Sequence, residues 1–179
     1  MEYQSIAQIY AGNDTIREKL KTTLEVLTLE QVTSLPEGEK WTISQIVEHL
    51  AMVEEGMSKI CAKLLTKAQG EDKKSRGIVE LSQNFIEKGA EVATVKLEAP
   101  DWVVPKAGQG IVQSMSRMDE NRKRLNDMRP LFEAYDGNTY KYPHPFFGDI
   151  SAVEWLTLVG GHEARHLRQI RNLLEKIGP

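Results

Sequence analysis

Apolar residues recur every three or four positions in several stretches of the chain, the spacing typical of helices that bury one face. The pattern predicts a first helix over about 13–29, which the segment SLPEGEK at 34–40 ends. A second helix begins after Thr42, which suits an N-cap, and carries the longest apolar seam. That seam consists of Ile46, Leu50, Val53, Met57, Ile60 and Leu64.

The middle of the chain is less regular. The charged, glycine-flanked segment GEDKKSRG at 70–77 predicts a loop before a short helix over about 79–88. The stretch KLEAPDWVVPKAGQG at 96–110 follows, and its prolines and glycines disfavour regular structure. We interpret this stretch as a proline-rich insertion between helices two and three, suited to roof a cavity, with the third long helix over about 111–128.

A fourth long helix begins near Ser151, whose hydroxyl can form a capping box with Glu154 three residues later. The preceding stretch at 129–150 is rich in proline, glycine and aromatic residues and shows no convincing strand alternation. Four long helices therefore predict an all-α fold, a four-helix bundle. The length of 179 residues suits a single domain over 1–179.

Composition and charge exclude several classes of function. Apolar residues make up 40% of the chain and charged residues 27%, as in folded soluble proteins. A net charge of -3 with both signs interspersed favours neither nucleic acid nor a membrane surface, so a small-molecule substrate is the expected partner. No apolar run could span a bilayer, the start MEYQSIAQIY lacks a secretory signal, and one cysteine cannot form an internal disulfide. We therefore expect a cytoplasmic protein.

Three histidines lie on the seams that should face the core. His162 and His166 continue the apolar stripe of the last helix, and residues four apart there have Cβ atoms about 5–6 Å apart, so both imidazoles can reach one ion. His49 lies at the edge of the second helix's apolar arc. Buried imidazoles without partners are costly, so either a shared cation or separate hydrogen bonds must satisfy them. HEARH lacks the order of the H-E-x-x-H zinc-protease motif, so Glu163 is not assigned as a base and the catalytic residues stay unknown.

The segments WTISQIVEHLAMVEE and HPFFGDISAVEWLTLVGGHEARHLRQI resemble the DinB-like (YfiT-like) superfamily of metal-binding four-helix proteins. The resemblance extends over nearly the whole chain, including LTLEQVTSLPEGEKW and KLEAPDWVVPKAG. It implies an up-down-down-up bundle in which His49, His162 and His166 bind a divalent ion, commonly nickel, zinc or iron. Three protein ligands leave positions for water or substrate, as in catalytic sites. Relatives often form dimers, so a homodimer is a further expectation from the resemblance.

The resemblance also suggests a type of reaction. Several characterised relatives are thiol S-transferases or isomerases that use a low-molecular-weight thiol such as bacillithiol, mycothiol or glutathione, and others are described as metal-dependent hydrolases. We therefore expect a metal-dependent enzyme of the thiol S-transferase or hydrolase type, with a small electrophilic substrate and such a thiol as a candidate cosubstrate. The alternatives are a non-catalytic stress protein that binds metal or a small molecule, and a bundle whose histidines are merely hydrogen-bonded.

Three further residues have both functional and structural interpretations. Cys61 lies about 18 Å along the second helix from His49, too far to share an ion, so core packing is expected. His144, between two prolines, is interpreted as structural, with closure over the site as the alternative. The tryptophans are expected to anchor packing, and for Trp102 the alternative is the rim of a pocket.

Charged residues near the histidines are also candidates. Glu48 and Glu54 lie close to His49 in sequence, and either could orient an imidazole as a neighbouring carboxylate. Arg165 and Arg168 could meet an anionic substrate, although pairing with a surface acid is the simpler interpretation. The basic run NRKR at 121–124 is interpreted as a solvated helix face.

Overall fold

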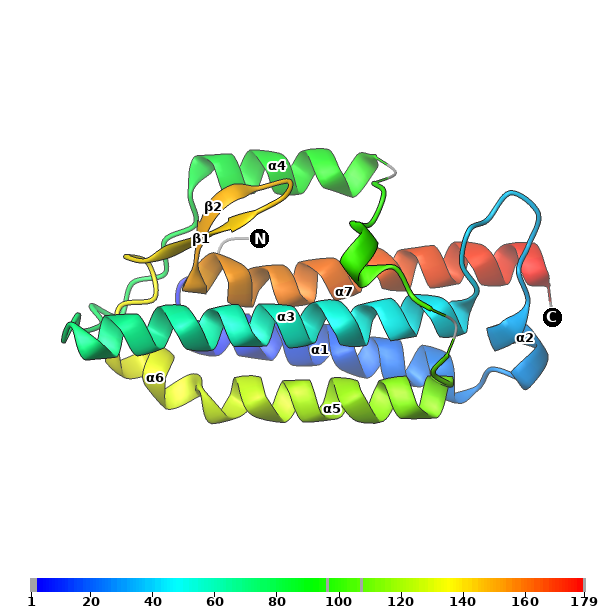
Figure 1. The fold of residues 1–179 in the computed structure, drawn as a ribbon, viewed down its shortest axis with the longest axis horizontal. Helices are drawn as coiled ribbons and strands as arrows, with labels where there is room; N and C mark the ends of the chain where they lie inside the picture. Colours follow the sequence, from blue (N-terminus) through cyan, green and yellow to red (C-terminus); the bar gives the residue numbers. More distant parts are fainter. Residues whose placement is uncertain (1–2, 96, 107, 179) are drawn as a thin grey trace.

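Four long helices pack side by side along the molecule (Figure 1). The computed structural model describes residues 3–95, 97–106 and 108–178. The bundle helices are α1 (Ile6–Glu25), α3 (Ile43–Gly70), α5 (Ile111–Asp127) and α7 (Ala152–Ile177). Two short helices, α2 (Leu29–Thr33) and α6 (Arg129–Ala134), lie at the ends of the bundle.

The order of the helices is up-down-down-up. Asn13 Nδ2 donates to the carbonyl of Leu156, and Arg17 pairs with Glu163, so positions along α1 and α7 advance together and these helices are parallel. Figure 1 shows α3 and α5 both running in the opposite direction. The predicted four-helix bundle is therefore confirmed. Within the described ranges, no helix is both long and apolar enough to traverse a membrane.

Side-chain caps set where the site-bearing helices begin. Thr42 caps α3 and Ser151 caps α7, each in a capping box, with Gln45 and Glu154 as the respective reciprocal partners. Both caps agree with the sequence prediction. The first helix begins earlier than predicted, at Ile6, because Ser5 caps it there and its first turns already bury Ile9 and Tyr10 in the core.

A second layer lies over one side of α3 and α7 (Figure 1). It comprises helix α4 (Gln83–Thr94), the 3-10 turn η1 (Asp101–Val103) and a hairpin of β1 (Lys141–His144) and β2 (Gly148–Ser151). The strands are antiparallel, with Lys141 opposite Ser151 and His144 opposite Gly148. The hairpin differs from the prediction for 129–150, because its four-residue strands are too short to show a clear alternating pattern.

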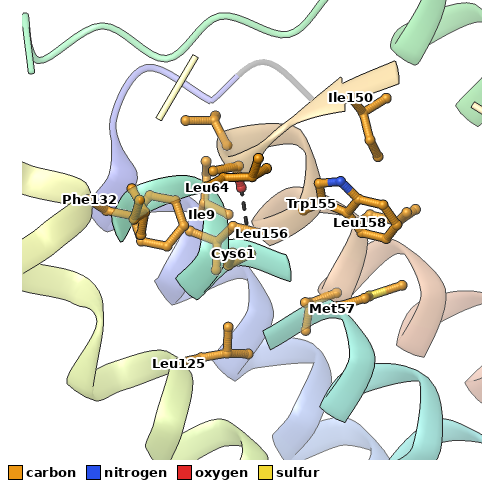
Figure 2. Packing of buried hydrophobic residues seen from close by; sticks show 14 of the residues in the cluster. Ile9, Met57, Cys61, Leu64, Leu125, Phe132, Ile150, Trp155, Leu156 and Leu158 are labelled. Carbon is orange, nitrogen blue, oxygen red and sulfur yellow. Dashed lines mark hydrogen bonds between the residues drawn. The ribbon is translucent and has the colours of Figure 1, made fainter. Parts of the chain in front are cut away.

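Buried apolar residues form two clusters along the bundle. One cluster lies near the hairpin and includes Ile9, Phe132 and Leu156, which Figure 2 shows. Cys61 belongs to this cluster, is fully buried, and its thiol contacts the carbonyl oxygen of Ala152 at 3.8 Å. The expected packing role of Cys61 is therefore what the structure shows. The second cluster occupies the other half of the bundle, around Leu20, Ile46 and Ile170.

A buried group of four charged side chains, one from each long helix, lies inside the bundle. Arg17 donates from Nη2 to Glu54 Oε2 at 2.6 Å and from Nε to Glu163 Oε1 at 2.7 Å. Arg122 contacts the other oxygens of the same carboxylates, Glu54 Oε1 at 3.4 Å and Glu163 Oε2 at 3.2 Å. We call these four residues the charge cluster. It links all four bundle helices through charge-assisted hydrogen bonds.

The charge cluster corrects one sequence interpretation. The sequence pattern predicts a solvated face for the run NRKR, but Asn121 is fully buried and Arg122 is 8% exposed. Lys123 and Arg124 do face solvent. A helix turns by about 100° per residue, so four consecutive polar residues cannot all lie on one face, and two of them point inward to polar partners.

Candidate metal centre

The predicted convergence of three histidines is present. His49 lies on α3, and His162 and His166 lie one turn apart on the antiparallel α7, so the three imidazoles meet between the two helices. One nitrogen from each ring lies within 4.8 Å of the others, and the Nε2 atoms of His49 and His162 are 3.3 Å apart. Tetrahedral ligands at about 2.0–2.1 Å from an ion are separated by roughly 3.3 Å. The spacing therefore fits a single metal ion.

Hydrogen bonds to the outer nitrogens orient two of the rings. His49 Nδ1–H donates to the carbonyl oxygen of Val103 at 2.7 Å. His166 Nδ1–H donates to Oε1 of Gln169 at 2.8 Å. Because both partners are acceptors, the proton lies on Nδ1 and each Nε2 keeps its lone pair. This arrangement, with the second nitrogen bonded to an oxygen, is the usual one for histidine ligands.

The electrostatic setting favours neutral imidazoles. His49 and His166 are 4% and 7% exposed, and His162 is partly exposed. Burial lowers the pKa of His49 and brings the pKa of His166 to about 3. Burial and the neighbouring charges of His166 and His49 hold the pKa of His162 well below its usual range. Since metal ions bind only the neutral ring, these residues are in the ligand form at neutral pH.

The three histidines line a large cleft between the bundle and the second layer. Its volume is about 1680 Å³, and residues of α3, α4, η1, the hairpin and α7 form its walls. Apolar side chains such as Val53, Phe147 and Leu158 contribute much of the lining. Trp102 also lines the cleft and is 72% exposed, which places it at a rim. A group held by the histidines would therefore face a space open to small molecules.

His144 lines the same cleft, but its ring accepts hydrogen bonds from the hairpin turn that follows β1. Its Nδ1 accepts from the backbone N–H groups of Phe146 at 3.1 Å and Phe147 at 3.3 Å. The ring proton therefore lies on Nε2, and burial lowers the pKa of His144 to about 4. A positive charge on His144 would lower the pKa of His162, so His144 lies near the site. It is not one of the three histidines that could share an ion.

Within the described part of the chain, neither glutamate near His49 is hydrogen-bonded to an imidazole. Glu48 Oε1 instead accepts from the backbone N–H of Lys106 at 3.2 Å, and Glu54 belongs to the charge cluster. The groups that orient the rings are the carbonyl of Val103 and the amide of Gln169, which sequence reasoning missed. Gln169 could have been found, because it follows His166 by one helical turn.

The two arginines of α7 differ in role. Arg165 donates from Nη1 to the backbone carbonyls of Val92 and Val95, which ties the end of α4 to α7. Arg168 is exposed and lines the cleft. Among the described residues, Arg165 therefore does not form the predicted pair with a surface acid but bonds to backbone oxygens. The reason is that the last carbonyls of α4 lack partners within their own helix.

Comparisons with known proteins agree with this architecture. The family model described as the DinB superfamily matches residues 13–170. The uncharacterized protein YuaE of Bacillus subtilis (strain 168) is 26% identical over 155 residues, which cover 86% of this chain and 90% of YuaE. The crystal structure of TT2238, described as a four-helix bundle protein, has a TM-score of 0.62 at 19% identity, covering 93% of this chain and 98% of that one, and supports the fold. Because the family match spans most of the bundle, the chain belongs to the DinB superfamily.

Proposed function

We propose that His49, His162 and His166 hold one divalent metal ion, and that the protein is a metal-dependent enzyme acting on a small electrophilic molecule. The observation that carries the proposal is the convergence of three neutral imidazoles at the wall of an open cleft. Structural zinc sites are usually closed by four protein ligands, whereas catalytic sites have three and an open position. Three ligands facing a cleft support the catalytic alternative.

The donor set limits the choice of metal. Imidazole nitrogen suits zinc, nickel, iron and copper, while calcium and magnesium prefer oxygen ligands. Within the described ranges, the ligand group contains neither carboxylate nor thiolate. Of the metals that suit imidazole, we propose nickel, zinc or iron, the three that the family resemblance implies.

The size of the cleft favours a reaction between two molecules. Pockets for one small ligand usually measure about 300–1,000 Å³, and this cleft measures about 1680 Å³. When bound, a divalent ion would favour the thiolate form of a coordinated thiol or lower the pKa of coordinated water toward about 7. The additional volume supports a thiol S-transferase, with a low-molecular-weight thiol beside the electrophile, ahead of a hydrolase.

Residues of the chain would bind and orient these molecules. The apolar part of the lining accommodates an apolar substrate body. His144 presents Nε2–H as a donor, because its Nδ1 already accepts two backbone bonds. Arg168 supplies an exposed positive charge on the helix that carries two of the histidines. An anionic group on either reactant would be attracted by this charge.

The test combines metal analysis with turnover. His162→Ala should abolish stoichiometric metal and leave the helical content largely intact, as measured by elemental analysis and circular dichroism. His144→Asn is the matched control, because it changes a histidine of the same cleft that we do not assign as a ligand, and it should retain full occupancy. Full occupancy in His162→Ala would refute the ligand assignment.

Activity distinguishes the enzyme from a binding protein. We expect turnover of an electrophile with one thiol of a panel, lost on chelation and restored by one cation. Stoichiometric metal without turnover against thiol or ester panels would favour the non-catalytic metal-binding protein. If the wild-type protein takes up no divalent ion, the remaining alternative is a bundle whose histidines are only hydrogen-bonded.

A further inference from the structure

The segment 101–106, which we call the strap, crosses α3 between the second layer and α5 (Figure 1). Two hydrogen bonds attach it to neighbouring residues of α3. His49 Nδ1–H donates to Val103 O at 2.7 Å, and the backbone N–H of Lys106 donates to Glu48 Oε1 at 3.2 Å. One attachment therefore orients a candidate metal ligand, and the other lies three residues further along the strap.

The part of the strap between the two attachments is stiff. It contains only Val104 and Pro105. Proline fixes its own φ near about -65° and restricts the preceding residue to extended conformations. Val104 has φ -69° and ψ 125°, as this restriction requires, and Pro105 is buried. The position of the Lys106 N–H group therefore controls where the carbonyl of Val103 points.

Glu48 is poorly placed to serve stability alone. Its side chain is 5% exposed, and burying a carboxylate is costly unless both oxygens have partners. Oε1 accepts the single bond from Lys106, whereas Oε2 has no hydrogen-bond partner among the described residues. A buried acid with one bond suggests a role in placing the strap.

We propose that Glu48 is a positioning residue for the metal centre: it holds the strap so that the carbonyl of Val103 meets His49 Nδ1–H. This bond keeps the proton of His49 on Nδ1 and directs Nε2 toward His162. The effect on metal rests on the proposed function, whereas the effect on the His49 tautomer does not. Removing a group that is bonded directly to a metal ligand typically changes metal affinity by about 10–100-fold, and Glu48 acts through such a group, the carbonyl of Val103.

Two pairs of variants test the hydrogen bond from both ends. Glu48→Met removes the acceptor at similar volume, and Glu48→Gln retains an acceptor oxygen. Lys106→Pro removes the backbone donor, and Lys106→Ala retains it. Zinc affinity is measured by competition with a chromogenic chelator. We expect Glu48→Met and Lys106→Pro to bind zinc about 10–100-fold more weakly, with both control variants within about threefold of wild type.

The double variant adds a further check. Because both changes break one bond, combining Glu48→Met with Lys106→Pro should weaken zinc binding little more than either change alone. Additive losses would show that the two residues act separately and would overturn the proposal. Wild-type affinity in a folded Glu48→Met variant would also overturn it.

A measurement on the metal-free protein separates this inference from the proposed function. Ring-nitrogen NMR should find the proton of His49 on Nδ1 in the wild type and in Glu48→Gln, and a mixture of tautomers in Glu48→Met. An unchanged tautomer in Glu48→Met refutes positioning, even if zinc binding falls. If the tautomer responds but the wild type binds no zinc, the positioning role of Glu48 stands and the metal centre is refuted.

Discussion

Replacing Arg17 with methionine is expected to destabilise the folded protein by about 3–5 kcal/mol at pH 7, the usual cost of removing one partner from a buried ion pair. Arg17 is 3% exposed and bonds two carboxylates, Glu54 at 2.6 Å and Glu163 at 2.7 Å. Methionine preserves most of the apolar stem, so the variant tests chiefly the charge. Two buried carboxylates would then depend on Arg122 alone, through contacts of 3.4 and 3.2 Å.

The loss should be visible by heat and by urea. For a chain of this size each kcal/mol changes Tm by about 2–4 °C, so the predicted fall is roughly 6–20 °C. Arg129→Met is the matched control, because Arg129 forms an exposed pair with Glu133 at 2.9 Å one helical turn away. Exposed pairs contribute at most about 1 kcal/mol. A loss below about 1 kcal/mol for Arg17→Met, equal to that of the control, would refute the importance of the charge cluster.

The pH dependence supplies an independent check. Burial raises the pKa of Glu163, and the charges of Arg17 and Arg122 oppose this rise. Without Arg17, the pKa of Glu163 should rise further above its value in the unfolded chain. A carboxyl whose pKa is raised on folding contributes stability at pH values below its unfolded pKa, and this contribution is lost as the pH rises through the folded pKa. The deficit of Arg17→Met should therefore be smaller at pH 5 than at pH 7, and a deficit that grows toward pH 5 would contradict this account.

Three further predictions test other parts of the structure. Gly160→Ala should lower the free energy of urea unfolding by about 1–3 kcal/mol, because the added Cβ would overlap Asn13 Oδ1. Gly161→Ala is the control: its Cβ would have nothing within 4 Å, so it should be neutral or slightly stabilising. Equal effects of the two changes would contradict the packing. Burial lowers the pKa of His144 from 6.5 to about 4, so His144 should make wild-type stability fall as the pH drops between these values. His144→Asn should weaken this pH dependence, and an unchanged pH dependence in the variant would contradict the contribution of His144. Burial also raises the pKa of Cys61 to about 12, so a thiol reagent should label the native protein far more slowly than the urea-unfolded one; equal rates would contradict its burial.

The convergence of the histidines could be predicted because helical periodicity determines which positions share a face. His162 and His166 continue an apolar stripe, and His49 interrupts another, so both faces had to meet inside a bundle. The caps at Thr42 and Ser151 were equally readable, because a capping box is a local pattern of four residues. Helix faces and caps are determined by residues within a few positions of one another, so the sequence alone was enough to predict them.

The orientation of His49 could not be predicted in the same way. Its hydrogen-bond partner is a backbone carbonyl 54 residues away, and every residue has such a group, so no side-chain pattern identifies Val103. The burial of Arg122 was missed for a related reason. Its partners are carboxylates on two other helices, and a basic residue in a basic run gives no sign that it points inward.

The metal centre and the charge cluster share α7 at consecutive residues. His162 lines the cleft, while Glu163, turned by about 100°, faces Arg17 and Arg122 inside the bundle. A small cavity of about 10 Å³ lies between them and is lined by both His162 and Glu163. The charge cluster therefore fixes the rotation of α7 that brings His162 to within 3.3 Å of His49. A bound metal would hold α3 and α7 together at the same level, and at 100 times its Kd it would add about 2.7 kcal/mol of stability. Adding metal should thus restore part of the stability lost in Arg17→Met, and an unchanged urea midpoint would refute this coupling.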